Sequence, residues 1–180
     1  TGYIINTPQH GIVVDTCVGN HKHRPDTKPW HMRDGPFLED MAAMGVAPES
    51  IDFVMCTHLH VDHIGWNTKL ENGRWVPTFP NAEYLFHEYE YAHWKTAEMP
   101  EGSGNKRREA YDDSVLPVVE AGQAVMVSDG HQLEDSVYVE SSPGHTPGHA
   151  FLHLDSPDGR AVFTGDCMHH PVQVAYPEWN

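Results

Sequence analysis

One short stretch of this sequence, HLHVDH at positions 58–63, is the part best equipped to do chemistry. It places three imidazoles and one carboxylate within six residues. Neutral imidazole and carboxylate groups are the usual ligands of zinc and similar first-row metal ions. His58 and His60 are two residues apart, so on an extended backbone they point to one side and can hold one ion. Asp62 and His63 are adjacent and follow a turn, which favours a second, neighbouring ion.

Two more ligand side chains follow strand-like segments further along the chain. A strand expected over 137–140 leads through a Ser-Ser-Pro-Gly turn into His145, and one expected over 161–164 leads through Gly165 into Asp166. Ligands at strand ends are how α/β sheets build sites, because the strand fixes the backbone and the turn aims the side chain. Two ions that share a water make a hydroxide nucleophile at neutral pH. A carboxylate can bridge both ions, and Asp166 is the candidate for that role.

The elements that must position these groups follow from apolar spacing and turn residues. Helices are expected over 37–44 and 87–95, and Pro117 argues against one long helix through 111–121. Asn72-Gly73 is a strong turn signal in a hairpin or loop expected over 66–80. The basic run 106–108 is expected to be a solvated turn, and Asp129-Gly130 to be a turn between two strands. Strands are expected over residues 4–5, 11–15, 51–57, 82–86, 125–127, 137–140, 151–154 and 161–164.

Length and charge exclude several function classes. The chain has 180 residues, which predicts a single domain over 1–180 with a real core. Its 26 acidic and 11 basic residues give a formal net charge of −15. Such a surface repels phosphates, so no nucleic-acid partner is expected. No stretch is apolar enough to predict a membrane partner, and the sequence carries no signal for the oligomeric state.

Cysteine usage and the two ends of the chain complete this picture. The three scattered cysteines imply no disulfide framework, which favours a reducing, cytoplasmic location. The chain starts without Met inside a strand-like run, and no signal peptide is visible. It ends at Asn180 without a closing element. We therefore expect a fragment that lacks its C-terminal part.

Three motifs, taken in order, resemble those of the metallo-β-lactamase-fold metallohydrolases. They are THLHVDH at 57–63, PGHTPGH at 143–149 and TGD at 164–166. The resemblance runs through nearly the whole chain, from Val13-Val14-Asp15-Thr16 to Asp166. It implies an α/β fold, the αββα sandwich, incomplete at both ends in this chain, with a dinuclear site at one edge.

The resemblance also implies a ligand set for two divalent metal ions, expected to be Zn²⁺. The six implied ligands are His58, His60 and His145 for the first ion, Asp62 and His63 for the second, and Asp166 as the bridge. The family has one more histidine well after the bridging Asp. His169 and His170 come too soon for that role, so this ligand is expected beyond Asn180. The second ion would then bind weakly or not at all in this fragment.

The residue at position 166 bears on the reaction that the resemblance implies. An Asp there is similar to the lactonase, glyoxalase II and phosphotriesterase branches, whereas true β-lactamases of this fold typically carry Cys or Ser. Segment 165–175 looks like the methyl parathion hydrolase-like branch, and the N-acyl-homoserine lactonases share the same core motifs. The resemblance thus implies an enzyme of the lactonase or esterase type. It would cleave a small-molecule lactone, ester or phosphotriester through a metal-bridging hydroxide.

Asp62 and Asp166 are the expected catalytic residues. Asp62 would orient the second ion, and Asp166 would pass a proton to the leaving alkoxide. Three alternatives stay open: a glyoxalase II-like thioester hydrolase, a β-lactam hydrolase and a non-hydrolytic di-iron module of the same fold. His149 is expected to be structural or to orient a ligand. Substrate-pocket residues are expected among His169, His170, Trp66 and Trp30.

Overall fold

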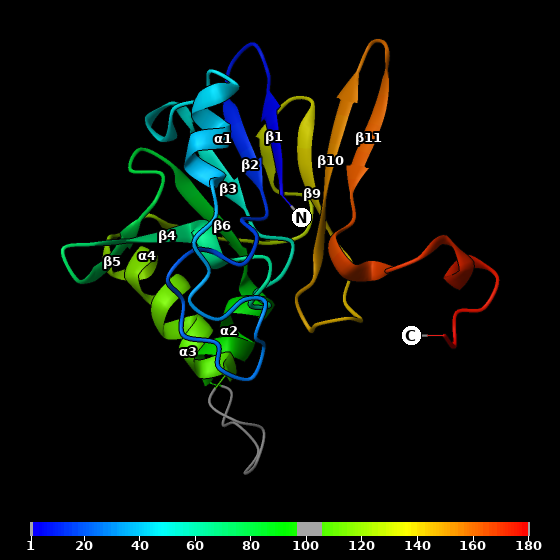
Figure 1. Ribbon diagram of the computed structural model, residues 1–180. Coiled ribbons are helices and arrows are strands. Elements are labelled where there is room, and N and C mark those ends of the chain that lie inside the picture. Colours follow the sequence, from blue (N-terminus) through cyan, green and yellow to red (C-terminus); the bar gives the residue numbers. More distant parts are fainter. Residues whose placement is uncertain (1, 97–105, 180) are drawn as a thin grey trace.

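Two β-sheets pack face to face, and helices cover the outer face of one of them (Figure 1). The computed structural model describes residues 2–96 and 106–179. The first sheet has the strand order β1 (Tyr3–Asn6), β2 (Gly11–Val14), β3 (Phe53–Met55), β6 (Glu83–His87) and β7 (Ala124–Val127). The second has the order β11 (Gly159–Phe163), β10 (Ala150–Ser156), β9 (Val137–Ser141) and β8 (Gln132–Glu134). A separate hairpin pairs β4 (Thr68–Glu71) with β5 (Arg74–Pro77).

Strand direction in the first sheet determines where functional loops can meet. β1 pairs antiparallel with β2, whereas the β2–β3, β3–β6 and β6–β7 pairs are all parallel. Because the carboxyl ends of parallel strands lie at one edge, the segments that follow β2, β3 and β6 come together there. The second sheet is antiparallel throughout.

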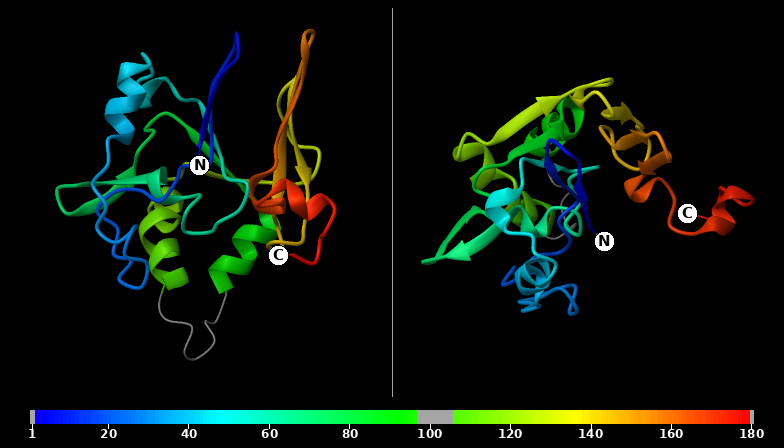
Figure 2. Two further views of the ribbon diagram at one scale, coloured as in Figure 1. Left: turned by 45° about the vertical axis from the view of Figure 1, so that its right-hand side comes forward. Right: turned by 90° about the horizontal axis from the view of Figure 1, so that it is seen from above.

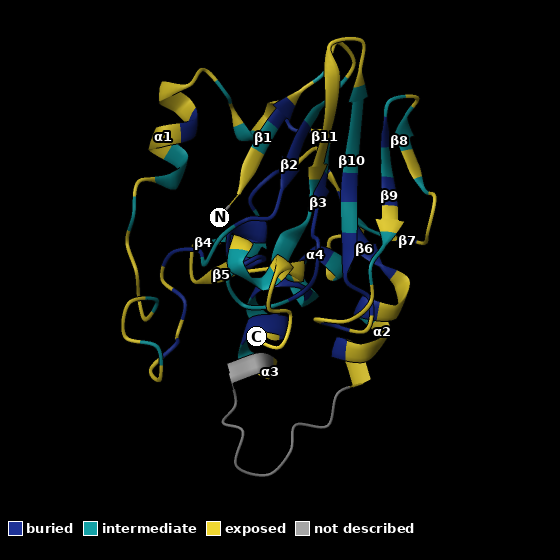
Figure 3. Cartoon of the chain, turned by 90° about the vertical axis from the view of Figure 1, so that its right-hand side faces the viewer, coloured by how far each residue is buried: buried dark blue, intermediate teal, exposed yellow. Residues whose placement is uncertain are grey.

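The two faces of the first sheet bury different partners. Val54 and Tyr84 belong to a core shared with the helices α1 (Phe37–Ala43), α2 (Glu88–Thr96), α3 (Lys106–Ser114) and α4 (Leu116–Glu120). Met55 and Leu85, the next residue on each strand, belong to a core shared with Leu152 of the second sheet. This alternation is the period of two that strands impose on their side chains. Figure 3 shows the resulting buried segments in the middle of β2, β9 and β10.

The structure confirms the α/β class and most of the expected elements. Helix 37–44 appears as α1, and the expected hairpin forms with Asn72 and Gly73 at positive φ values of 51° and 77°. Among the described residues, α-helices cover the first sheet only, so three layers of the expected αββα sandwich are visible. The described residues also form four short 3-10 helices: η1 (Pro48–Ser50), η2 (Gly65–Asn67), η3 (Gly165–Cys167) and η4 (Pro171–Val174).

Two local expectations were wrong. The basic run 106–108 does not form a turn, because it begins helix α3. The Asp129-Gly130 turn connects β7 to the unexpected short strand β8, so β7 and β9 lie in different sheets. The helix break near Pro117 is confirmed, since α3 ends at Ser114 and α4 begins at Leu116.

The last described segment leaves the body of the fold. Residues after η3 extend away from both sheets (Figures 1 and 2). Val174 and Trp179 in this segment are exposed. Within residues 2–96 and 106–179, no helix has the length and apolar character needed to cross a membrane.

Candidate metal centre

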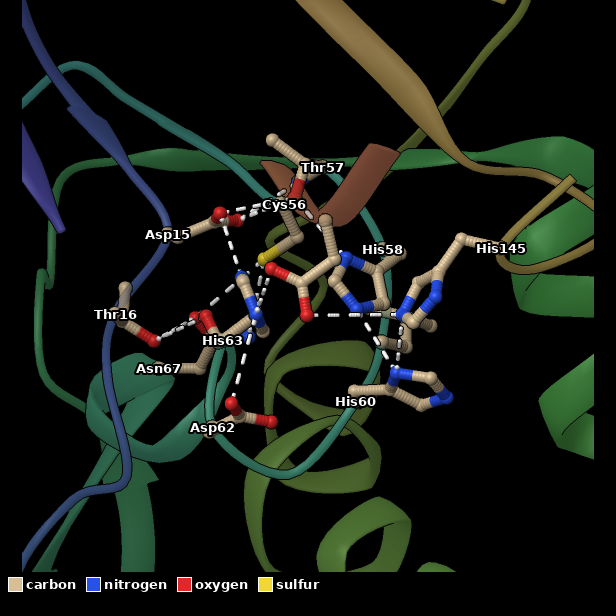
Figure 4. Close-up of polar contacts among 12 residues, drawn as sticks. Asp15, Thr16, Cys56, Thr57, His58, His60, Asp62, His63, Asn67 and His145 are labelled. Atoms are coloured by element: carbon tan, nitrogen blue, oxygen red, sulfur yellow. Dashed lines mark hydrogen bonds and ion pairs between the residues drawn. The ribbon is translucent and has the colours of Figure 1, made fainter. Parts of the chain in front are cut away.

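Three loops bring the candidate ligands to one edge of the two sheets. His58, His60, Asp62 and His63 follow β3, and the close-up in Figure 4 shows them beside His145, which lies between β9 and β10. Asp166 lies in η3, directly after β11. The structure therefore brings together all six ligands that the motifs predict, from both sheets.

Three imidazoles converge in what we call the first donor set, His58, His60 and His145. The Nδ1 atom of His60 lies 2.9 Å from His58 Nε2 and 2.9 Å from His145 Nε2. His58 is fully buried, and the other two rings are partly exposed. A neutral imidazole has a single N–H, so protons on neutral rings cannot satisfy three converging nitrogens. The first donor set fits a cation that accepts three nitrogen ligands.

His58, His63 and Asp166 form a second donor set, whose ligand atoms also lie within 4.8 Å of one another. His63 Nε2 is 3.2 Å from Asp166 Oδ1 and 3.7 Å from Asp62 Oδ2. Asp166 Oδ2 lies 3.7 Å from His145 Nε2. The two oxygens of Asp166 thus face different donor sets. The spacing argument did not foresee that His58 would lie within reach of both.

Asp15, at the end of β2, determines which nitrogens the histidines present. Its Oδ2 atom accepts a hydrogen bond from His63 Nδ1 at 2.8 Å, so the neutral form of His63 presents Nε2 as a lone pair. Asp15 also accepts from the Thr57 backbone N–H at 2.8 Å and from the Thr57 hydroxyl at 2.9 Å. Because the Thr57 hydroxyl donates to Asp15, it can accept from His58 Nδ1 at 3.1 Å. His58 then also presents Nε2.

The sequence reasoning assigned no role to Asp15. The signal was present, since Asp15 follows a strand as directly as the ligands do. Its backbone adopts φ = 56°, and its side chain is buried.

The electrostatics of the site favour a neutral His58, a positively charged group at His63 and an ionised Asp166. Burial, together with the surrounding imidazoles, lowers the pKa of His58 far below its usual range. Burial acts to lower the pKa of His63 too, but its hydrogen bond to Asp15 and the nearby carboxylates outweigh burial and raise that pKa. Burial acts to raise the pKa of Asp166, but His63 and the other nearby imidazoles outweigh it and lower that pKa. The same carboxylates that attract a proton to His63 would attract a metal ion there.

The donor sets therefore fit divalent metal ions. In the second set, His63 uses its Nδ1 proton on Asp15 and turns Nε2 toward the carboxylates of Asp62 and Asp166. An unprotonated Nε2 and two carboxylates repel one another unless a positive charge lies between them, and either a proton or a metal ion can supply it. In the first set, three imidazole nitrogens meet in the same way.

The two histidines that follow Asp166 have different surroundings. The Nε2 atom of His169 is 3.3 Å from Asp166 Oδ2, and His169 lines a cavity of about 580 Å³ together with Asp62 and His63. His170 instead caps η4, where its Nδ1 atom accepts from the Val172 backbone N–H at 3.1 Å.

The expected aromatic pocket residues lie apart from this cavity. Trp66 is buried and stacks on Phe37 with ring centroids 5.0 Å apart. Trp66 and Trp30 line a separate cavity of about 310 Å³. His149 is fully buried 5.2 Å from the ring of His58, and neither ring nitrogen has a hydrogen-bond partner among the described residues.

Comparison with known proteins agrees with this geometry. The family model of the metallo-beta-lactamase superfamily matches residues 2–177. This chain belongs to the metallo-beta-lactamase superfamily. A relative in this superfamily, the N-acyl homoserine lactonase AttM of Azorhizobium caulinodans, is 27% identical over 146 residues, which are 78% of this chain and 50% of the relative. An N-acyl homoserine lactonase of Bacillus cereus is 22% identical over 165 residues, 86% of this chain and 57% of that protein. The chain thus spans about half the length of these two relatives.

Solved structures show the same superfamily fold. AidC, a dizinc quorum-quenching lactonase solved with a product bound, superimposes with a TM-score of 0.78 at 20% identity. The alignment covers 98% of this chain and 60% of AidC. The hydrolase AbOPH, described as a member of the beta lactamase superfamily, aligns with a TM-score of 0.77 at 26% identity, covering 98% of this chain and 59% of AbOPH. The metallo-β-lactamase fold expected from the motifs is confirmed.

Proposed function

We propose that this protein is a dinuclear, zinc-dependent hydrolase that opens the lactone ring of N-acyl homoserine lactones. The position of Asp166 carries this proposal. Its Oδ1 atom lies 3.2 Å from His63 Nε2 and its Oδ2 atom 3.7 Å from His145 Nε2, so one carboxylate faces both donor sets. This arrangement suits two ions held close enough to act on one substrate.

When bound, the two ions would supply Lewis-acid chemistry, activating water and stabilising negative charge on the attacked oxygen. Asp166 is the group of this chain placed to move protons. Its low pKa keeps it ionised at neutral pH and makes it a weak base, so a proton that it takes from the attacking water is readily given up again. It can then return that proton to the ring oxygen that leaves when the ester C–O bond breaks. His169, 3.3 Å from Asp166 Oδ2, can donate a hydrogen bond that orients the carboxylate during this transfer.

The lining of the 580 Å³ cavity favours an uncharged ester over an anionic substrate. Its apolar part includes Val14, Val162, Phe163 and Met168. Among the described residues that line it there is no lysine or arginine, while Asp15, Asp62 and Asp166 are present. A glutathione thioester carries carboxylates, and no described residue of this lining offers a lysine or arginine side chain to pair with them. A neutral lactone with an acyl chain fits both properties, and two curated relatives are N-acyl homoserine lactonases by name.

A substrate panel tests the proposal. The full chain, purified with zinc and with its metal content measured, is assayed on N-hexanoyl homoserine lactone, S-lactoylglutathione, paraoxon and a cephalosporin. We expect the lactone to have the highest kcat/KM, and we expect chelation to abolish its turnover. If the zinc-loaded protein leaves the lactone intact, or prefers S-lactoylglutathione, the proposed substrate class is wrong. Two iron ions with redox-active spectra and no hydrolysis would refute hydrolase function altogether.

A further inference from the structure

Glu90 is a buried carboxylate that belongs to neither donor set. It lies in the first turn of α2, and only 1% of its surface is exposed. Burying a carboxylate is unfavourable unless hydrogen bonds compensate for the lost water. Three N–H groups provide that compensation, and two of them come from the loops that carry the metal ligands.

The two oxygens of Glu90 bind different loops. Oε1 accepts from the Leu59 backbone N–H at 3.0 Å, and Leu59 stands between His58 and His60. Oε2 accepts from the Gly148 backbone N–H at 2.9 Å, three residues after His145. One carboxylate therefore joins the loop that supplies two ligands of the first donor set to the loop that supplies the third. Leu59 and Gly148 are 31 and 58 residues from Glu90 in the sequence, so only the folded chain makes this link.

The carboxylate itself is held in one orientation. Trp94, one helical turn after Glu90, donates its indole N–H to Oε1 at 2.6 Å. Trp94 is itself nearly buried, so this hydrogen bond is shielded from water. A carboxylate fixed in this way can set the distance between two loops rather than follow their movements.

Close packing also holds the loop of residues 143–149 against helix α2. A Cβ atom at Gly148 would clash with the Glu90 backbone nitrogen, so the 143–149 loop lies directly on α2 and only glycine fits there. The loop continues into β10, where the Ala150 N–H donates to the Thr57 carbonyl at 2.9 Å. His145 lies three residues before Gly148 in this loop, so a firmly held Gly148 limits how far His145 can move.

We infer that Glu90 is a positioning residue that fixes the spacing of the two ligand-bearing loops and so sets the metal affinity of the first donor set. This inference rests on the proposed metal centre but not on the identity of the substrate. A purely structural role would stabilise the fold without changing the affinity of the folded protein for metal. Groups that orient ligands typically alter metal affinity by about 10- to 100-fold when they are removed.

The Glu90→Gln variant tests the inference with almost no change in volume. A glutamine that keeps its oxygen toward Leu59 and Trp94 must turn its NH₂ group toward the Gly148 N–H, where two donors repel. The flipped amide instead turns its NH₂ group toward the N–H groups of Leu59 and Trp94, where donors again repel each other. Either orientation breaks the link between the loops. Glu88→Gln is the matched control, because Glu88 is exposed in the same helical turn.

The measurement is the Zn²⁺ dissociation constant of the full chain, obtained by competition with a chelator. We expect Glu90→Gln to raise it by about 10- to 100-fold and Glu88→Gln to leave it at the wild-type value. A folded Glu90→Gln protein that binds Zn²⁺ as tightly as wild type overturns the inference, whatever its thermal stability.

A second measurement on the metal-free wild-type protein needs no variant. If the link exists, the Gly148 amide should exchange its hydrogen as slowly as the Leu59 amide. Exchange at the rate of an exposed loop amide overturns the inference even if Glu90→Gln does not fold. Wild-type protein that binds no Zn²⁺ would refute the proposed function, whereas the exchange experiment would still decide whether Glu90 holds the two loops.

Discussion

Replacing Asp15 by Asn should weaken metal binding at the second donor set while leaving the backbone in place. Asp15 has φ = 56°, a conformation in which Asn is one of the most favourable residues, so the substitution causes little strain. The substitution instead changes the hydrogen bonds that the Asp15 side chain makes. The carboxylate accepts from His63 Nδ1 and from the backbone and hydroxyl of Thr57, all between 2.8 and 3.1 Å.

An amide can satisfy only part of this set. If its NH₂ group faces Thr57, the buried Thr57 N–H loses its acceptor, at a cost of about 1–3 kcal/mol of stability. If the NH₂ group faces His63, the ring must accept at Nδ1 and carry its proton on Nε2. That nitrogen is the atom 3.2 Å from Asp166, so the proton would occupy the position of the metal. Orienting groups of this kind change metal affinity by about 10- to 100-fold.

The assay is zinc stoichiometry and affinity by competition titration, with thermal unfolding of the metal-free protein measured in parallel. Asp52→Asn is the control, because Asp52 also accepts a backbone N–H, from Gly11 at 2.8 Å, but is exposed and far from the ligands along the sheet. We expect Asp15→Asn to lose at least about tenfold in affinity for one of two ions and Asp52→Asn to lose none. Two zinc ions bound by Asp15→Asn at wild-type affinity would refute the tautomer argument.

Four further outcomes follow from the same structure. Asp166→Ala should reduce lactone turnover to background, because both donor sets and the proton transfer lose their shared carboxylate; near-normal kcat would refute this role. His149→Ala should reduce kcat less, since this ring is buried beside His58 and contacts no donor-set carboxylate, and a loss equal to that of Asp166→Ala would instead indicate a ligand. Chelation should lower the thermal unfolding midpoint, because zinc at 100 times its dissociation constant stabilises the folded protein by about 2.7 kcal/mol. A midpoint that chelation leaves unchanged would contradict binding of one ion by ligands from two loops. Burial lowers the pKa of Lys22 to about 7, so between pH 7 and 10.5 the unfolded chain binds more protons than the folded chain. The contribution of Lys22 to the free energy of unfolding therefore rises with pH, by up to about 1.4 kcal/mol per pH unit. Lys22→Met, which leaves Asp113 paired with Arg24, should lack this rise. The measurement is the free energy of unfolding from urea titrations at pH 7 and pH 9, and an equal change between the two pH values in both proteins would refute the prediction.

Parts of the fold and site that depend on local sequence could be predicted. The ligand motifs follow strands directly, so the position of His145 and Asp166 at strand ends was visible in the pattern of apolar residues and turns. Helix α1 was equally clear, because Pro36 precedes it and Gly45, with φ = 76°, follows it. In each case the signal lies within a few residues of the feature that it predicts.

Features set by distant contacts could not be predicted in this way. The bonds that give Asp15 its role reach Thr57 and His63, which are 42 and 48 residues away. Glu90 looks like an ordinary helical glutamate until the fold brings two loops onto its oxygens. The start of α3 at Lys106 was missed because a basic run has no apolar spacing, and here tertiary packing of Tyr111 determines the helix instead.

The geometry of this metal centre is a property of the packing between the two sheets. The loop after β3 supplies His58 and His60, whereas His145 and Asp166 come from the second sheet. A shift of one sheet against the other would therefore separate side chains of the same donor set. The inter-sheet core around Met55 and Leu152 and the bond from Ala150 to Thr57 resist such a shift. Glu90 adds a link between the two loops at the donor sets themselves, and for this reason we propose that metal affinity depends on a side chain that belongs to neither set.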